Sequence, residues 1–399
     1  MENISAERLA QELLGHCLAS RPWPEHLLDD LIALGGDRAL FSIVVEKLAD
    51  LFEPSLCRVY AGLFSQIIAR RIPGLHAEHL AARYERVRRP RVFDRDPETI
   101  QNIFVLSRVT LGADIAVTST ILDAAKQRFP GARIWFAGSK KSWELFAADP
   151  RLRHLAITYG RGSSIDDRLS IWPQLREAVS MPHSIVIDPD SRLTQLGLLP
   201  ICPEEDYYLF ESRAYGAQSD ESLPALARRW VAEVFGVADA RPYVAPGLDA
   251  AEFATTVSLG VGENPSKRVS GPFEEEVLRR LPRPILIDKG AGGEEAERVE
   301  RAVAKVEGDG IVMWDGSFAG FAAHIQRSRL YVGYDSAGGH AAAACGIPLI
   351  SIFAGAVSER MFQRWRPTGA ARIHVVRPEG LNEAELLATF EACLPPVSL

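Results

Sequence analysis

The alternation of short apolar runs with helical segments after residue 99 is the feature that most restricts the fold of this 399-residue chain. The runs are rich in β-branched and aromatic residues, and helical spacing of apolar side chains follows most of them. Strands that alternate with helices in this way form parallel sheets covered by helices on both faces. The first predicted strands are 103–106, 132–138, 154–159 and 184–190, and the helices among them include 118–129 and 141–149.

A second series of the same kind follows a connector rich in proline and glycine at residues 241–249. Two doubly wound units joined by a hinge would leave a cleft at the carboxyl ends of both sheets, where such folds bind ligands. The sequence therefore predicts two α/β domains, 98–245 and 246–399. The predicted strands of the second domain are 255–262, 284–288, 310–314, 330–335 and 348–355.

The first 97 residues have a different pattern. Three segments, 6–19, 25–35 and 38–52, carry apolar side chains at helical spacing, and no alternation typical of a strand is found there. Six arginines follow between Arg83 and Arg95. We interpret this stretch as a solvated linker, with a contact for acidic partners or anionic headgroups as the alternative. The sequence thus predicts an all-helical N-terminal region, residues 1–97, that ends in an arginine-rich linker.

The composition is that of a globular protein, with 47% hydrophobic and 24% charged residues. A net charge of −7 speaks against a dedicated nucleic-acid binder. The five cysteines form no CxxC pair, which indicates free thiols in a reducing compartment. The N-terminus does not resemble a signal peptide, and the longest uncharged run, 341–357, is too short to span a bilayer. We expect a cytoplasmic protein, with attachment to a membrane surface as an open alternative.

The segment most informative about chemistry is 330–355. A predicted strand ends at Asp335, and the small residues 336–339 lead into a helix that starts near His340. Small residues let a ligand approach the backbone closely, and the free N–H groups of a helix N-terminus attract phosphate. We interpret this turn as a phosphate or diphosphate site. The alternative is a tight turn that only packs, with Asp335 as its N-cap.

The segment 257–268 is predicted to be a strand followed by a glycine-bearing loop. It contains no GK[ST] sequence, and Gly260 and Gly262 lack the third glycine of a dinucleotide fingerprint. The pair Lys267 and Arg268, at the carboxyl end of a strand, could still neutralise a diphosphate. A surface loop with solvated charges is the alternative.

The segment 104–119 is predicted to be a strand followed by Arg108, by Gly112 and Asp114, and then by a helix that contains Thr118. An acid just beyond a strand can act as a general base if it faces the cleft. An aspartate that only caps the helix is the alternative. Elsewhere, His76 and His79 have helical spacing, but no further ligand accompanies them, so no metal site is predicted.

Together, the three segments resemble glycosyltransferase family 9, which contains the lipopolysaccharide heptosyltransferases. The late family motif D-[ST]-G-x-x-H-x-x-A-A corresponds to DSAGGHAAAA at 335–344. The middle basic loop corresponds to NPSKR at 264–268, and the early G-D-x-x-x-[ST] motif to GADIAVT at 112–118. The resemblance covers about residues 101–375. The sequence departs from the family pattern at Ala113, Thr120 and Ala337, where glycine, proline and glycine are usual.

The resemblance implies a GT-B fold, in which two Rossmann-like domains face a cleft. It also implies an inverting transfer from a nucleotide-diphosphate sugar to a glycan, glycolipid or protein acceptor, without a metal or another cofactor. Asp114 would take the proton from the acceptor hydroxyl, and Lys267, helped by Arg268, would stabilise the departing diphosphate. The other implied residues bind the donor (Asp335, Ser336, Gly338, Gly339 and His340) or shape the loops (Gly112, Thr118 and Gly262).

Two other functions stay open at this point. A nucleotide-sugar epimerase can have the same two-domain architecture, and it would convert a free nucleotide sugar without an acceptor. A non-catalytic protein that binds nucleotide sugars, or a scaffold, would bind protein partners or a second copy of itself through residues 1–97.

Overall fold

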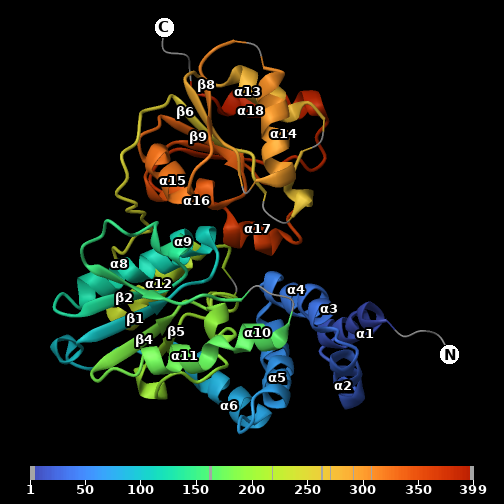
Figure 1. Ribbon diagram of the computed structural model, residues 1–399, viewed down its shortest axis with the longest axis vertical. Helices are drawn as coiled ribbons and strands as arrows, with labels where there is room; N and C mark the ends of the chain where they lie inside the picture. Colours follow the sequence, from blue (N-terminus) through green and yellow to red (C-terminus); the bar gives the residue numbers. More distant parts are fainter. Residues whose placement is uncertain are drawn as a thin grey trace.

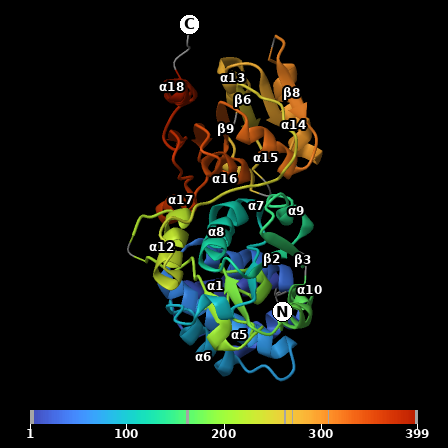
Figure 2. The same cartoon turned by 90° about the vertical axis from the view of Figure 1, so that its left-hand side faces the viewer.

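The computed structural model describes residues 5–160, 164–217, 219–261, 264–269, 271–290, 292–306 and 308–395. Two parallel sheets form two lobes that are stacked along the long axis of the molecule (Figure 1). The N-terminal helices lie beside the lower lobe, which contains the first sheet (Figures 1 and 2). The predicted α/β architecture with two parallel sheets is therefore confirmed.

The first sheet has the strand order β3-β2-β1-β4-β5, with all pairs parallel. Its central strand β1 is buried along its whole length because helices cover both faces. The prediction missed β5, which has only three residues and shows no periodicity. The strands are β1 (Asn102–Leu106), β2 (Arg133–Gly138), β3 (Leu152–Ala156), β4 (Ser184–Asp188) and β5 (Tyr207–Leu209). The helices and turns of this lobe are η2 (Pro97–Thr99), α7 (Leu111–Ala113), η3 (Asp114–Thr118), α8 (Ser119–Arg128), α9 (Lys140–Trp143), α10 (Ile165–Leu169), α11 (Ile171–Ala178), η4 (Arg192–Thr194), η5 (Glu204–Asp206) and α12 (Leu223–Phe235).

The second sheet has the order β11-β10-β9-β6-β7-β8, again with all pairs parallel. The prediction missed its edge strand β11. The strands are β6 (Thr255–Ser258), β7 (Ile285–Asp288), β8 (Ile311–Trp314), β9 (Leu330–Tyr334), β10 (Leu349–Ile352) and β11 (Ile373–Val376). The helices and turns are η6 (Pro265–Lys267), α13 (Phe273–Arg280), α14 (Gly293–Ala304), α15 (Phe318–Gln326), α16 (Ala337–Ala344), α17 (Glu359–Trp365) and α18 (Glu383–Cys393).

The described part of residues 1–97 contains helices and no strand, as the periodicity predicts. These helices share a hydrophobic core with the first sheet, in which Tyr60, Phe64 and Tyr84 pack in one cluster with Phe104 and Val186. The helical region is therefore a layer of the first lobe. Its elements are α1 (Ala6–Leu18), α2 (Glu25–Ala33), α3 (Asp37–Ala39), η1 (Leu40–Val45), α4 (Glu46–Asp50), α5 (Pro54–Arg71) and α6 (Ala77–Val87).

The arginine-rich stretch differs from its predicted role as a solvated linker. Arg83 is buried and donates a hydrogen bond to the carbonyl of Gly197 at 2.6 Å. Most of the other arginines pair with acidic residues of the same chain. The ion pairs are Arg86–Glu204, Arg88–Glu211 and Arg95–Asp206. The stretch therefore fastens α6 to the segment around β5.

The uncharged run 341–357 contains the second half of α16 and the buried strand β10. None of the described helices has both the length and the apolar character needed to cross a bilayer. All five cysteines are free thiols.

Candidate active site between the two lobes

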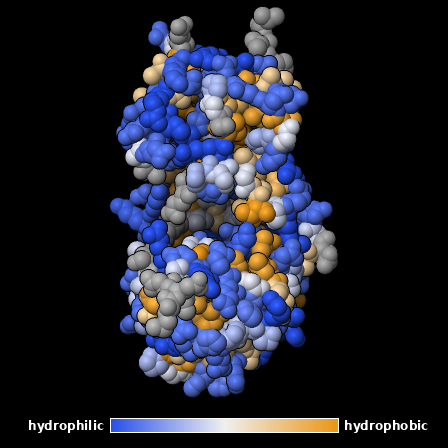
Figure 3. Space-filling model, turned by 90° about the vertical axis from the view of Figure 1, so that its right-hand side faces the viewer, coloured by the Kyte–Doolittle hydropathy of each residue, from blue (hydrophilic) through white to orange (hydrophobic). Residues whose placement is uncertain are grey.

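A cavity of about 660 Å³ lies between the two lobes, at the carboxyl ends of both sets of strands. Figure 3 shows the molecule hollowed between the lobes on the side where the helical region lies. The first lobe contributes residues 110–113 and Lys141 to the wall. The second lobe contributes Ser258, Gly260, Val261, Lys267, Asp288, Gly290, Glu295, 316–318, 335–337, His340, Met361 and Trp365. The topology thus brings all three motif segments to one place.

The turn after β9 presents the N-terminus of α16 to this cavity. Ser336 is the N-cap residue, but its side chain makes no capping hydrogen bond, so the first N–H groups of α16 are left for another acceptor. Gly338 and Gly339 do not line the cavity. A Cβ at Gly338 would collide with the hydroxyl of Tyr331 beneath the helix. Gly338 is therefore explained by packing within the lobe.

The loop after β6 places a lysine beside that helix terminus. Lys267 Nζ donates to Asp335 Oδ2 at 2.5 Å, and both side chains line the cavity. Arg268 does not line it, and its guanidinium lies 3.7 Å from the exposed carboxylate of Glu294. The structure thus brings Lys267 and Asp335 together but not Arg268. The predicted loop residue Gly262 lies outside the described residues.

Asp114 is fully buried and does not line the cavity. Its Oδ1 accepts hydrogen bonds from the Arg108 N–H at 2.7 Å and from the Thr118 hydroxyl at 2.8 Å. Its Oδ2 accepts from the Ser107 hydroxyl at 2.7 Å. Burial raises the pKa of Asp114, and these hydrogen bonds oppose the rise. In this conformation the carboxylate holds the loop 107–118, whereas the prediction has it facing the cleft.

Gly112 and His340 lie at one of the contacts between the lobes. A Cβ on Gly112 would lie 3.4 Å from both Ala337 Cα and His340 Cδ2, so the backbone of the first lobe approaches α16 closely here. His340 is 6% exposed, and burial lowers its pKa. The negative charge of Asp335 opposes this lowering, and the positive charge of Lys267 adds to it. A neutral imidazole is therefore favoured at this cavity wall.

Several residues of the cavity wall were missed by the sequence reasoning, among them Asp288, Met361 and Trp365. Asp288, at the end of β7, could have been found as an acid that ends a predicted strand. Burial raises the pKa of its carboxyl, and the positive charge of Lys141 across the cleft lowers it. Met361 and Trp365 line the cavity from α17, where no motif marks them.

A second cavity of about 470 Å³ adjoins the first, and its wall belongs almost entirely to the first lobe. The two cavities share residues 110–112, Lys141 and Ala337 in their walls. The wall of the second cavity includes four residues that carry a hydroxyl group, Ser139, Ser142, Thr158 and Tyr159. This arrangement gives two adjoining compartments, one on each lobe.

The family comparison concerns the second lobe. Residues 286–385 match the model of glycosyltransferase family 9 (heptosyltransferase). This match lies entirely within the second lobe. The matched range includes Asp288, α16 and α17, whereas Asp114 and Lys267 lie before it. A search of the curated proteins finds no match.

Solved structures with the family 9 fold match most of this chain. The E. coli heptosyltransferase WaaC with ADP is 15% identical, with 74% of this chain and all of that chain covered and a TM-score of 0.54. A glycosyl transferase of family 9 from Veillonella parvula is 15% identical, with 73% and 97% covered and a TM-score of 0.53. E. coli ADP-heptose heptosyltransferase II is 14% identical, with 73% and 98% covered and a TM-score of 0.50. The expected GT-B fold is thereby confirmed, and the family 9 match supports a glycosyltransferase.

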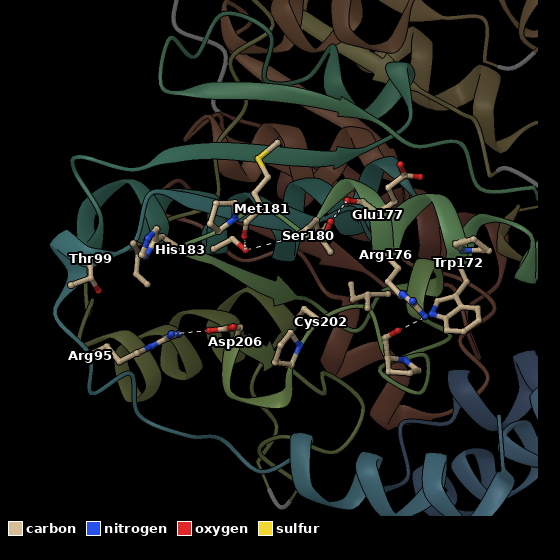
Figure 4. A pocket seen from close by; sticks show the side chains of 18 residues that line it. Arg95, Thr99, Trp172, Arg176, Glu177, Ser180, Met181, His183, Cys202 and Asp206 are labelled. Carbon is tan, nitrogen blue, oxygen red and sulfur yellow. Dashed lines mark hydrogen bonds and ion pairs between the residues drawn. The ribbon is translucent and has the colours of Figure 1, made fainter. Parts of the chain in front are cut away.

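Among the described residues, no three His, Cys, Asp or Glu side chains are grouped so as to hold a metal ion. A cavity of about 1160 Å³ lies at the amino end of β4 in the first lobe, away from the matched residues 286–385 (Figure 4). Its wall includes Trp172, Met181 and the ion pair of Arg95 with Asp206. It contains none of the predicted site residues.

Proposed function

We propose that the protein transfers a sugar from a nucleotide-diphosphate sugar to a glycan, glycolipid or protein acceptor, with inversion at the anomeric carbon. The observation that carries this proposal is the Lys267–Asp335 pair beside the uncapped N-terminus of α16, in a cavity that both lobes enclose. A cation and free backbone N–H groups suit a diphosphate, and the adjoining cavity offers room for an acceptor.

In this proposal the donor lies against the second lobe. Lys267 and the first N–H groups of α16 bind the diphosphate, and the Asp335 carboxylate accepts hydrogen bonds from donor hydroxyls. Ser336 and His340 complete the wall around them. Because WaaC was solved with ADP and with ADP-2-deoxy-2-fluoro heptose, ADP-heptose is the first donor to test.

The transfer step needs charge stabilisation at both ends of the reacting bond. An acceptor hydroxyl oxygen forms a bond to the anomeric carbon while the bond from that carbon to the diphosphate oxygen breaks. The developing negative charge on the diphosphate is met by Lys267 and the α16 terminus. The proton of the hydroxyl passes to a carboxylate, which the family resemblance assigns to Asp114. Since Asp114 is enclosed, this role requires Ser107 or Thr118 to release it when substrates bind.

A thermal-shift panel of ADP-, UDP-, GDP- and dTDP-sugars tests the donor site. A ligand that binds only the folded protein adds about 2.7 kcal/mol of stability at 100 times its Kd. We expect one nucleotide sugar to stabilise the wild type and to have little effect on Lys267→Ala. Lys305→Ala is the control because this exposed lysine does not line the cavity. No shift with any nucleotide sugar would refute the proposal and favour a scaffold.

Turnover measurements test the chemical step. With acceptor present, we expect transfer of the sugar, whereas conversion of the nucleotide sugar without an acceptor would show an epimerase. Asp114→Asn keeps the size of the side chain and should lower kcat about 10²- to 10³-fold while the nucleotide-induced thermal shift persists. Full turnover by a folded Asp114→Asn variant would restrict Asp114 to holding the loop.

A further inference from the structure

The helical region contacts the wall of the donor cavity through Phe52. Phe52 lies in the turn between α4 and α5 and is 3% exposed. Leu48 and Leu56, its buried neighbours along the chain, belong to the core that the helical region shares with the first sheet. Phe52 instead packs in the hydrophobic cluster that contains residues of both lobes. The Phe52 side chain is therefore packed in a different cluster from the helices on either side of it.

The partner of Phe52 is an aromatic residue of the cavity wall. The Phe52 and Trp365 rings meet edge to face, with centroids 6.3 Å apart and an interplanar angle of 83°. Trp365 is half-buried, lines the cavity, and lies with its ring centroid 5.9 Å from that of His340. Three rings thus form a continuous row from the helical region to α16. Such edge-to-face pairs favour one orientation of each ring.

The backbone at Phe52 shows that this contact has a conformational cost. Its φ angle is +54°, in the left-handed region that bulky side chains rarely adopt. Such a conformation persists only where the surrounding packing holds it, and here the packing is the contact with Trp365.

The neighbouring residue Asp50 supports the same placement of the turn. The surrounding protein partly desolvates the Asp50 carboxyl, and this desolvation raises its pKa. The charges of Arg192 and Lys267 oppose this rise. The end of α4 is thus within electrostatic reach of the lysine in the donor cavity.

We propose that Phe52 is a positioning residue: it fixes the Trp365 ring against His340, so that the helical region sets the affinity of the cavity for the nucleotide sugar. This inference rests on the proposed function in naming the ligand. Phe52 itself contacts no part of the donor, because it does not line the cavity. The effect of the helical region passes through Trp365.

The test uses Phe52→Gly in the full chain, because glycine accepts the left-handed backbone and removes only the ring. We expect the Kd and KM for the donor to rise about three- to tenfold while kcat changes less. Phe52→Tyr keeps the ring and should bind within about twofold of the wild type. Ser20→Gly, at another left-handed position of the helical region, is the control and should change nothing. In a Trp365→Ala background, Phe52→Gly should have no further effect.

Hydrogen exchange without nucleotide separates this inference from the proposed function. Phe52→Gly should speed amide exchange in α17 and in the first turn of α16 at least threefold, whereas Ser20→Gly should not. Unchanged exchange, or a donor affinity equal to that of the wild type, would overturn the role of Phe52. If the wild type binds no nucleotide sugar while exchange still responds, the proposed function fails and the coupling of the helical region to the cavity stands.

Discussion

At the scale of single residues, the acids of the first lobe show how burial decides the role of a carboxylate. Asp188 ends β4 and is fully buried. It accepts hydrogen bonds from the Thr194 and Tyr207 hydroxyls, both at 2.5 Å, and from the Ser191 N–H at 2.6 Å. Burial raises its pKa to about 6, and these hydrogen bonds oppose the rise. Like Asp114, it faces donors within its own lobe.

The raised pKa of Asp188 predicts a specific dependence of stability on pH. The unfolded chain loses this proton near its ordinary pKa of about 3.9, whereas the folded protein holds it to about pH 6. Between these pH values the folded state therefore binds more protons than the unfolded state. The contribution of Asp188 to the stability of the fold falls as pH rises from about 4 to 6 and is constant above pH 6. We expect Asp188→Asn to remove that fall in Tm, measured by calorimetry from pH 4.5 to 8.

The quantity to compare is the difference in Tm between wild type and variant at each pH, because carboxylates with a lowered pKa change the stability in the opposite direction as pH rises. The pKa of Asp149, for example, is lowered by its hydrogen bond with Lys126 although burial opposes this. Asp239→Asn, at an exposed position, should leave the pH profile unchanged. A variant Asp188→Asn that keeps the wild-type profile would contradict the prediction.

At the scale of helices and strands, the sequence predicted the long periodic elements well. Buried strands such as β1 and β9 consist almost entirely of apolar residues, and this pattern is typical of a parallel sheet that is covered on both faces. β5 and β11, with three and four residues, are too short to show a period. The arginine-rich stretch was misinterpreted because its acidic partners follow more than 100 residues later. Only the folded chain brings such partners together.

Arg83 and Arg89 provide a matched pair for testing how α6 is held. Arg83 is buried, bonds to the Gly197 carbonyl and lies 4.6 Å over the Tyr207 ring, whereas Arg89 is exposed. We expect Arg83→Ala to lower the free energy of unfolding by about 2–3 kcal/mol through the lost bond and packing. Arg89→Ala should change it by less than about 0.5 kcal/mol. Equal effects in urea titrations would contradict the structure.

At the scale of the whole molecule, the site is assembled by topology from segments that the sequence marked separately. Because the carboxyl ends of parallel strands share one edge, the segments after β1, β6 and β9 meet in one cleft. This much follows from the sequence. The orientation of Asp114 and the insertion of Phe52 do not, since both depend on which neighbours fill the surrounding space.

The shared core of the helical region predicts the result of removing it. A chain that begins at residue 98 would expose the face of the first sheet that now packs on α5 and α6. We expect this truncated chain to be insoluble, or to melt well below the full chain, because a large apolar face would meet water. Solubility and calorimetry of the truncated chain measure this. A truncated chain that melts like the full protein would show that residues 1–97 fold as a separate module.

Helix α17 has a consequence for how substrates enter. Its Arg364, which is fully buried, donates to the carbonyls of Gly216, Ser219 and Glu221 in the first lobe. Its Phe362 packs on Phe353 of the second lobe. The two lobes are thus joined by the connector 241–254 and also by the contacts of α17 with both of them. Because α17 contacts both lobes beside the cavity, we expect it to limit how far the lobes can separate, so that substrates enter and products leave along the side of the cleft that α17 does not cover.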